Sequence, residues 1–454
     1  MCRIVLVNSP INKNYIRSIR TGTYPPPSLG IIASFLKQHN KNVEILLLDG
    51  ELLTHEEIIN SLEADIVGIS VNIMTYEAGL AIARHAKLKG ATVVLGGPAV
   101  DPIGKKILQN RPYIDYVITG EGEVALSKLL NSEPLDKIPG LIYRKEKEII
   151  ENLPVPISLN NLAIPDYCDL PMEEYFTNYQ ERYRGFKPFT GSLAIFSRKG
   201  CIWREKTNGG CVFCMIPHAG MRFKTPENLW KEIDFYFQEY GINFFWEVSD
   251  TFSEHNGWLT EFIKKRPKHL EDIHFHIYAR PNHITDRMAK LLKKLNVFEV
   301  FIGAESGDDQ ILKNSTKGCK VEHTYRAIEM LSKEGIYTIL SFVFGLPGET
   351  KETLEKTVSL ASEMVKYDKV IETSSSVLLP IPGSPAFKQM IEIPELKKKY
   401  DTDLFDLEEL KKDWAKYFTN VSYEEIVDAK SRALELFPLN NTFSQIGKQS
   451  APMC

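Results

Sequence analysis

Short, continuous apolar runs alternate with segments of helical spacing twice along this 454-residue chain. A strand needs such a run when helices cover both faces of its sheet, whereas an amphipathic helix places apolar residues three or four positions apart. The first series occupies residues 1–150 and the second residues 191–385. This alternation predicts an α/β protein in which two parallel sheets are each covered by helices.

The first series predicts a Rossmann-like parallel-sheet domain. Its strands are expected at residues 3–7, 43–48, 66–71, 92–95 and 116–118, with helices at 29–38, 55–62, 76–89, 103–109 and 123–130. Glycines follow several of these strands, at Gly50, Gly96, Gly97 and Gly120. Without a Cβ atom they would let the backbone approach a ligand, although each could be an ordinary turn. Neither G-x-G-x-x-G nor the P-loop pattern occurs, so neither a dinucleotide nor a P-loop nucleotide is indicated.

The second series predicts a partial (β/α)6 barrel with its functional site at the carboxyl ends of the strands. Strands are expected at residues 193–196, 244–248, 275–278, 297–302, 338–344 and 375–379. The helices between and after them are expected at 227–239, 257–265, 284–295, 309–314, 321–333 and 351–365.

Two further segments flank this barrel. Residues 151–190 contain several prolines and predict an irregular linker. Residues 386–454 predict a small helical C-terminal region that could cover the substrate, with helices at 392–399, 407–418 and 423–436.

Three of the seven cysteines, Cys201, Cys211 and Cys214, directly follow the first strand of the second series in a C-x9-C-x2-C pattern. A C-x-x-C turn suits either zinc or an iron–sulfur cluster. With His218 the three cysteines could form a Cys3His zinc site. A [4Fe–4S] cluster held by three cysteines would instead leave one iron open to a further ligand. The cysteines alone leave both alternatives open.

Composition restricts the remaining classes. The four other cysteines lie far apart, so a disulfide framework is not indicated and a reducing cytoplasm fits best. The net charge of −4 gives no electrostatic argument for a nucleic-acid partner. No apolar stretch is long enough to span a membrane, and the first apolar run is too short for a signal peptide.

The motifs of the first series resemble a known domain. TYPPPSLGIIASFLKQ, ADIVGIS, VVLGGPAV and IDYVITGEGEVAL are similar to the N-terminal cobalamin-binding domain of many radical SAM enzymes. The resemblance covers about residues 1–170. It implies a cobalamin groove lined by loop residues of this domain: Pro26, Ser28, Ser70, Gly96, Gly97, Gly120 and Glu121. The alternative is a domain of the same fold that no longer binds the cofactor.

One departure concerns the cobalt. Cobalamin proteins that bind the metal through a histidine carry D-x-H-x-x-G, whereas this chain has Asp49-Gly50-Glu51 without a histidine two positions on. The resemblance therefore implies a cobalt whose lower face has no histidine ligand.

The motifs of the second series resemble the strand ends of the radical SAM fold. They are FWEVSDTF, IYARPNHIT, FIGAESGDDQILKNSTKG, FVFGLPGET and LLPIPGSPAF, in this order over residues 190–390. This resemblance favours a [4Fe–4S] cluster over zinc. The family usually spaces its cysteines as C-x3-C-x2-C, but the catalytic subunit of Elongator has the wider spacing found here. The insert, residues 203–210, is expected to loop out and to turn at Gly209 and Gly210.

The resemblance also implies roles for single residues. Cys201, Cys211 and Cys214 would hold the cluster. The residues implied to contact SAM are Phe213, Asp250, Arg280, Glu305, Gly345 and Gly348. Each has a structural alternative: Phe213 a core aromatic, Arg280 and Glu305 an ion pair that closes the barrel, and the two glycines a tight turn. At residue 249 the family commonly has a first aspartate where this chain has Ser249. No substrate acid or base can be named.

Together the two resemblances imply a cobalamin-dependent radical SAM enzyme. The leading hypothesis is methylation of an unactivated carbon, or of phosphorus, through methylcobalamin and a 5′-deoxyadenosyl radical. An unactivated C–H bond has no acidic proton to remove, which favours a radical route. Expected partners are a small-molecule or peptide substrate and an external electron donor of the flavodoxin or ferredoxin type. Alternatives are a non-methylating rearrangement, cyclisation or C–S bond formation, RNA modification, and a cobalamin or iron sensor.

Overall fold

The computed structural model describes residues 2–11, 22–183, 187–207, 209–216 and 220–437. The chain forms two compact units. The first comprises Met1–Ala194 together with Glu395–Leu404, and the second comprises Ile195–Pro394 together with Phe405–Cys454. The single C-terminal helical region predicted after residue 385 is therefore divided, because ten of its residues pack within the first unit.

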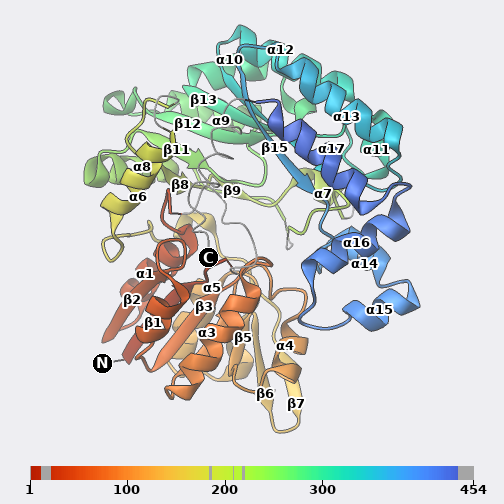
Figure 1. The fold of residues 1–454 in the computed structure, drawn as a ribbon. Coiled ribbons are helices and arrows are strands. Elements are labelled where there is room, and N and C mark those ends of the chain that lie inside the picture. The colour runs from red at the N-terminus through yellow and green to blue at the C-terminus, as the bar shows by residue number, and fades with distance from the viewer. Residues whose placement is uncertain (1, 12–21, 184–186, 208, 217–219, 438–454) are drawn as a thin grey trace. The chain divides into compact units, whose positions relative to one another are not determined.

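The first unit is built on a seven-stranded sheet with the order β2-β1-β3-β4-β5-β6-β7 (Figure 1). Its strands are β1 (Cys2–Asn8), β2 (Val43–Asp49), β3 (Ile66–Ser70), β4 (Thr92–Gly96), β5 (Tyr116–Ile118), β6 (Leu141–Lys145) and β7 (Glu148–Glu151). The first five strands pair in parallel. Because β2 and β3 lie on opposite sides of β1, the strand order reverses at the β1/β3 junction, which is where open α/β sheets bind ligands.

Helices cover both faces of this sheet. On one face α1 (Pro27–His39) contacts α5 (Gly122–Leu130). On the other, α2 (His55–Asn60), α3 (Tyr76–Leu88) and α4 (Gly104–Asn110) enclose the main apolar core with the strands. The run Ile4–Val7 is accordingly buried at every residue, as a strand between two helical layers must be. The predicted parallel sheet is confirmed.

Two parts of the first unit differ from the prediction. Strands β6 and β7 were not predicted, and they pair antiparallel at the edge of the sheet. Helix α6 (Met172–Tyr183) lies within the segment predicted to be an irregular linker. Its tyrosines Tyr175, Tyr179 and Tyr183 are buried at a spacing of four, and the Tyr175 hydroxyl donates to Asp49 at 2.5 Å. Four of the five prolines in the predicted linker precede this helix, and Pro188 follows it.

The second unit contains a six-stranded sheet with the order β15-β14-β13-β12-β11-β8. Its strands are β8 (Leu193–Ile195), β11 (Phe244–Glu247), β12 (His274–Ala279), β13 (Val297–Glu305), β14 (Tyr337–Phe344) and β15 (Val370–Val377). Pairs from β11 to β15 are parallel, and each strand lies beside the next one along the chain, which confirms the predicted partial barrel. β15 begins at Val370, whereas the predicted strand begins at residue 375. The prediction missed the start because Glu372–Ser376 are polar and do not form the apolar run expected of a buried strand.

Helices follow these strands on the outside of the sheet. They are α8 (Pro226–Tyr240), α9 (Asn256–Lys264), α10 (Asp286–Lys294), α11 (Asp309–Asn314), α12 (Val321–Lys333) and α13 (Lys351–Met364). Four more follow β15: α14 (Pro385–Met390), α15 (Pro394–Tyr400), α16 (Leu407–Phe418) and α17 (Tyr423–Glu435). α17 packs on α13 and β15 and so forms part of the second unit's wall, whereas α15 belongs almost entirely to the first unit.

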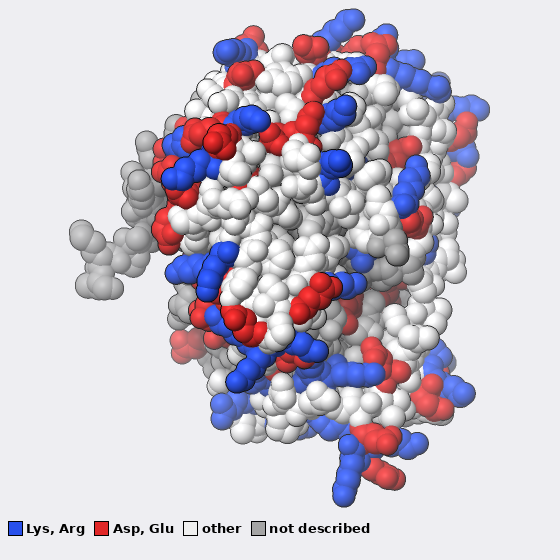
Figure 2. Space-filling model, turned by 90° about the vertical axis from the view of Figure 1, so that its right-hand side faces the viewer, with Lys and Arg blue, Asp and Glu red and all other residues white. Residues whose placement is uncertain are grey.

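Two further properties concern the charges on the surface and the length and apolar character of the helices. On the face shown in Figure 2, Lys and Arg side chains are interspersed with Asp and Glu. In the described ranges, no helix has both the length and the apolar character needed to cross a bilayer.

Asp403 holds the segment Glu395–Leu404 in the first unit. Its side chain is 1% exposed and accepts from Arg111 Nε at 2.7 Å and from Asn110 at 2.7 Å. The Tyr76 hydroxyl donates to the same carboxylate at 3.2 Å. Nearby, Asp401 forms a much more exposed ion pair with Lys106.

We expect Asp403→Ala to destabilise the first unit by about 1–3 kcal/mol, because it leaves the buried Tyr76 hydroxyl and the partly exposed Arg111 without their acceptor. Asp401→Ala, two residues away, is the matched control and should cost about 0–1 kcal/mol. Urea unfolding of the full chain measures both. Equal losses for the two variants would contradict the role assigned to Asp403.

Candidate functional site

The cysteine loop begins where β8 ends. After β8, the short strand β9 (Arg198–Lys199) pairs antiparallel with β10 (Arg222–Phe223). Gly200, the residue that follows β9, has φ +95°. A Cβ atom on Gly200 would lie 2.8 Å from the Gly220 carbonyl oxygen. The Asp250 carboxylate accepts from the Gly200 N–H at 2.8 Å. Asp250, predicted to contact SAM, therefore fixes the backbone immediately before Cys201.

The insert between the first two cysteines is helical. Residues 203–210 were predicted to loop out, but α7 (Ile202–Thr207) occupies most of the insert. This run contains no glycine or proline, so nothing in it opposes a helical turn. The predicted turn at Gly210 is present, with φ +79° and its N–H donating to Thr207 Oγ1 at 3.1 Å.

The three thiols lie within electrostatic range of one another. Burial raises the pKa of Cys214 to about 12, and Cys211, Asp250 and Cys201 contribute in the same direction. Burial also raises the pKa of Cys201. Such thiols stay protonated unless a metal centre holds them as thiolates. Three neighbouring thiols that a metal centre can hold as thiolates fit the donor set of a three-cysteine [4Fe–4S] cluster. Phe213 lies half-buried between two of them.

The zinc alternative depends on His218, which lies outside the described residues. Within the part of the chain that the structure describes, no three His, Cys, Asp or Glu side chains, the three cysteines included, are arranged to hold a single metal ion. All six described cysteines are free thiols.

Arg280 and Glu305 are both buried, but they do not pair with each other. Arg280 Nη1 donates to Cys211 Sγ at 3.7 Å, and its Nη2 donates to the Lys317 carbonyl. The guanidinium also lies over the Trp203 ring, 4.9 Å from its centroid. Glu305 instead pairs with the Lys317 ammonium at 2.6 Å. Glu305 therefore forms a buried ion pair, as the structural alternative predicted, but its partner is Lys317 and not Arg280.

Lys317 is a site residue that the sequence did not single out. Burial favours its neutral form, but Glu305 and Cys211 outweigh this effect and the pKa of Lys317 is raised. Its side chain is 7% exposed. It belongs to the motif FIGAESGDDQILKNSTKG, in which nothing distinguishes a buried lysine from an exposed one such as Lys313.

Cys319, one of the four cysteines outside the C-x9-C-x2-C pattern, is buried beside the same charges. Burial raises its pKa to about 11, and Lys317, Arg280 and Cys211 are among the groups that act on it.

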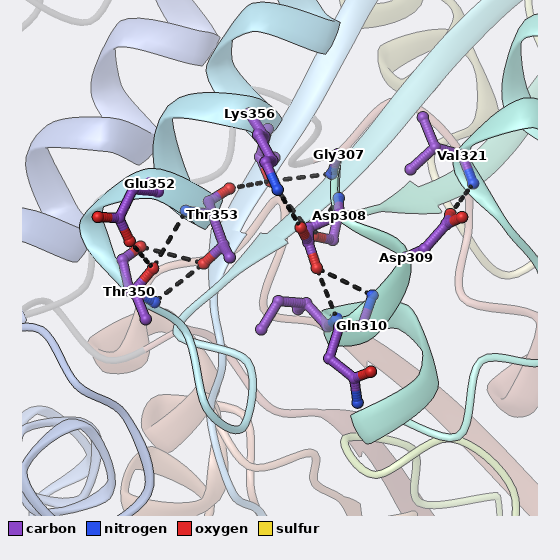
Figure 3. A network of polar contacts seen from close by, with 12 residues as sticks. Gly307, Asp308, Asp309, Gln310, Val321, Thr350, Glu352, Thr353 and Lys356 are labelled. Atoms are coloured by element: carbon purple, nitrogen blue, oxygen red, sulfur yellow. Dashed lines mark hydrogen bonds and ion pairs between the residues drawn. The ribbon is translucent and has the colours of Figure 1, made fainter.

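The segment after Glu305 is fixed by the polar network shown in Figure 3. The Gly307 N–H donates to Thr357 Oγ1 at 2.9 Å. Asp308 caps α11 by accepting from the Gln310 N–H at 2.9 Å, and its other oxygen accepts from Lys356 at 2.7 Å. These contacts tie the end of β13 to α13, and so they hold Glu305 in place.

The turn Gly345–Gly348 follows β14, and its described polar groups bond within the protein. Both glycines have positive φ, +84° and +83°. The Gly345 N–H donates to Glu349 at 2.6 Å, and the Gly345 carbonyl accepts from Trp414 Nε1 at 2.7 Å. The Gly348 N–H donates to the Phe418 carbonyl at 2.8 Å. These bonds support the tight-turn alternative, and the contact with adenosine stays a prediction.

The residues predicted to line a cobalamin groove lie at one edge of the first sheet. Ser70 ends β3 and pairs in register with Gly96, which ends β4. Pro26 is the buried N-cap of α1, and Ser28 is exposed in its first turn. Gly97 has φ +98°, and a Cβ there would lie 2.5 Å from the Val71 carbonyl oxygen. The fold itself therefore requires this glycine, whereas Gly96 would tolerate a side chain.

Gly120 and Glu121 are partly covered by the segment that follows β7. A Cβ on Gly120 would lie 2.9 Å from Pro154 Cβ. The Glu121 carboxylate accepts from the Ile157 N–H at 3.0 Å. The linker residues thus occupy part of this edge.

Glu349 provides a pH test of the site. It is fully buried, and burial raises its pKa from 4.5 to about 8. The folded state therefore holds its proton more tightly than the unfolded chain, so this group's stabilisation is complete below pH 4.5 and is lost as the pH rises to about 8. We expect Glu349→Gln to remove this decline, at about 1.4 kcal/mol per unit of pKa difference. Thermal unfolding across this pH range measures it. Glu352→Gln, an exposed change on α13, should keep the wild-type slope, and an unchanged slope in Glu349→Gln would refute the assignment.

Comparison with known proteins identifies two domains in the chain. The model of the radical SAM superfamily matches residues 205–361, and that of the B12 binding domain matches residues 16–130. An uncharacterized methyltransferase of Pyrococcus horikoshii is 27% identical over 406 residues, covering 86% of this chain and 83% of the relative.

Two groups of solved structures share the fold. The radical S-adenosylmethionine methyltransferase TsrM of Kitasatospora setae, with cobalamin and a [4Fe–4S] cluster bound, has a TM-score of 0.65 at 19% identity, covering 86% of this chain and 74% of TsrM. The cobalamin-dependent S-adenosylmethionine radical enzyme OxsB has a TM-score of 0.70 at 19% identity, covering 95% and 66%. The two matched domains imply a [4Fe–4S] cluster, SAM and cobalamin as cofactors. The chain thus contains a radical SAM domain and, before it, a B12 binding domain, as its motifs predict.

Proposed function

We propose that this protein is a cobalamin-dependent radical SAM methyltransferase acting on an unactivated carbon or on phosphorus. The observation that carries the proposal is that Cys201 and Cys211 lie within electrostatic range of Cys214 and that Arg280 donates to Cys211, in a chain that also contains a B12 binding domain. When bound, the cluster and SAM supply a 5′-deoxyadenosyl radical, and cobalamin supplies a transferable methyl group. The methyltransferase name of the Pyrococcus relative supports the same reaction class.

In this proposal the protein's own residues position the reactants. The three cysteines hold the cluster, and Asp250 fixes the backbone that presents the first of them. Arg280 and Glu305 offer a cation and an anion to the zwitterionic methionyl group of SAM. Both side chains are already held by contacts within the second unit, so little ordering is needed when SAM binds.

The cobalamin would lie at the edge of the first sheet formed by Ser70, Gly96 and Gly97, next to the β1/β3 junction. We further infer a small-molecule or peptide substrate, an electron donor of the flavodoxin or ferredoxin class, and a reducing cytoplasmic environment that keeps the thiols free.

The test starts from the full chain, purified anaerobically and reconstituted with iron, sulfide and hydroxocobalamin. We expect about four iron atoms and about one cobalt per chain. We also expect dithionite-dependent cleavage of SAM to 5′-deoxyadenosine and transfer of a labelled methyl group from SAM to the bound cobalamin.

Cys214→Ala should lose iron and SAM cleavage while it retains cobalt, because the cobalt site lies in the other unit. Cys168→Ala, an exposed cysteine of the first unit, is the control and should retain both metals. Iron without cobalt would withdraw the cobalamin-dependent proposal. SAM cleavage without methyl transfer would instead favour a rearrangement, cyclisation or C–S bond formation.

A further inference from the structure

The Glu305–Lys317 ion pair has an unusual setting. Both side chains are under 10% exposed, at 8% and 7%. Glu305 has φ +63°, a left-handed conformation that is uncommon for a residue with a side chain. A Cβ on Gly303 would lie 2.4 Å from Glu305 Oε1 and 2.8 Å from Lys317 Nζ. The backbone of β13 is thus shaped to accommodate this pair.

A second buried cation lies beside the pair. The Arg280 guanidinium links the two ends of the site, since one nitrogen donates to Cys211 Sγ and another to the Lys317 carbonyl. Carboxylates also act on this site: Glu254 interacts electrostatically with Arg280 and with Cys201, and Asp250 with Cys214. Fixed charges of both signs therefore surround the cysteines, and Lys317 is a buried cation among them that interacts with Cys211.

Each fixed charge of this kind has a direct effect on an iron–sulfur centre. Reduction adds one electron to the cluster, and a fixed positive charge in a low-dielectric site stabilises the more negative state. A nearby carboxylate has the opposite effect. The buried pair therefore contains one group that favours reduction and one that opposes it.

We propose that Lys317, restrained and partly offset by Glu305, sets the reduction potential of the cluster held by Cys201, Cys211 and Cys214. This inference rests on the proposed function. The step is a one-electron reduction of the oxidised cluster by a low-potential donor of the flavodoxin or ferredoxin class, or by dithionite in vitro, and no proton is transferred.

The experiment is a redox titration of the reconstituted full chain without SAM, in which electron paramagnetic resonance detects the reduced cluster. Lys317→Met should lower the midpoint potential, because it removes the cation and exposes the cluster to Glu305. Glu305→Gln should raise it. The double variant should lie between the two, and Lys317→Arg should stay close to wild type. A tenfold lower ratio of reduced to oxidised cluster at a fixed potential corresponds to about 59 mV.

Lys224 offers a matched control. It is a buried lysine of the second unit that pairs with Glu232, with side chains 6% and 3% exposed. Lys224→Met should destabilise the protein without changing the midpoint potential. If Lys317→Met does not assemble a cluster, Glu305→Gln still tests the predicted sign.

The inference is wrong if the midpoint potential shifts in the same direction in Lys317→Met and Glu305→Gln, or shifts in neither. The proposed function still stands in that case, provided that the wild-type chain assembles a reducible cluster. An equal shift in Lys224→Met would also overturn the inference. If SAM binds more weakly to Lys317→Met but the potential without SAM is unchanged, Lys317 is a SAM-binding residue and the inference is wrong. A wild-type chain without a reducible cluster would defeat the proposed function and the inference together.

Discussion

The second unit's site depends on one hydrogen bond, from the Gly200 N–H to the Asp250 carboxylate. Gly200 has a conformation that other residues adopt only with strain, and it directly precedes Cys201. Asp250 follows β11, the strand next to β8 in the sheet. The adjacent strand ends therefore fix the point at which the cysteine loop leaves the barrel. From that point α7 and the turn at Gly210 lead the chain to Cys211 and Cys214, and Cys201 and Cys211 both lie within electrostatic range of Cys214.

The sequence predicted the repeating framework well, for a simple physical reason. Strands between two helical layers must be apolar throughout, so a run such as Ile4–Val7 is visible without any tertiary information. Where a strand or helix departs from that rule, the prediction was wrong or incomplete. The polar residues of β15 concealed its start, and the prolines before α6 suggested a linker where buried tyrosines build a helix.

The site shows the same division. Cysteine spacing and the family resemblance of the strand-end motifs predicted roles for the three thiols, Arg280 and Glu305, and these roles stay predictions. Their partners could not be predicted, since pairing depends on burial that a sequence does not display. Lys317 resembles any other lysine, and Glu349 any other glutamate at a helix start, until the surrounding side chains remove water from them.

The division of the chain between the two units has a consequence for biosynthesis. The first unit is discontinuous: its sheet is encoded within the first third of the chain, but the segment that carries Asp403 is encoded close to the end. During translation, the barrel residues must therefore emerge from the ribosome before Arg111 and Tyr76 can meet their buried acceptor. The first unit can therefore complete its contacts only after residues 195–394 of the second unit have been synthesised.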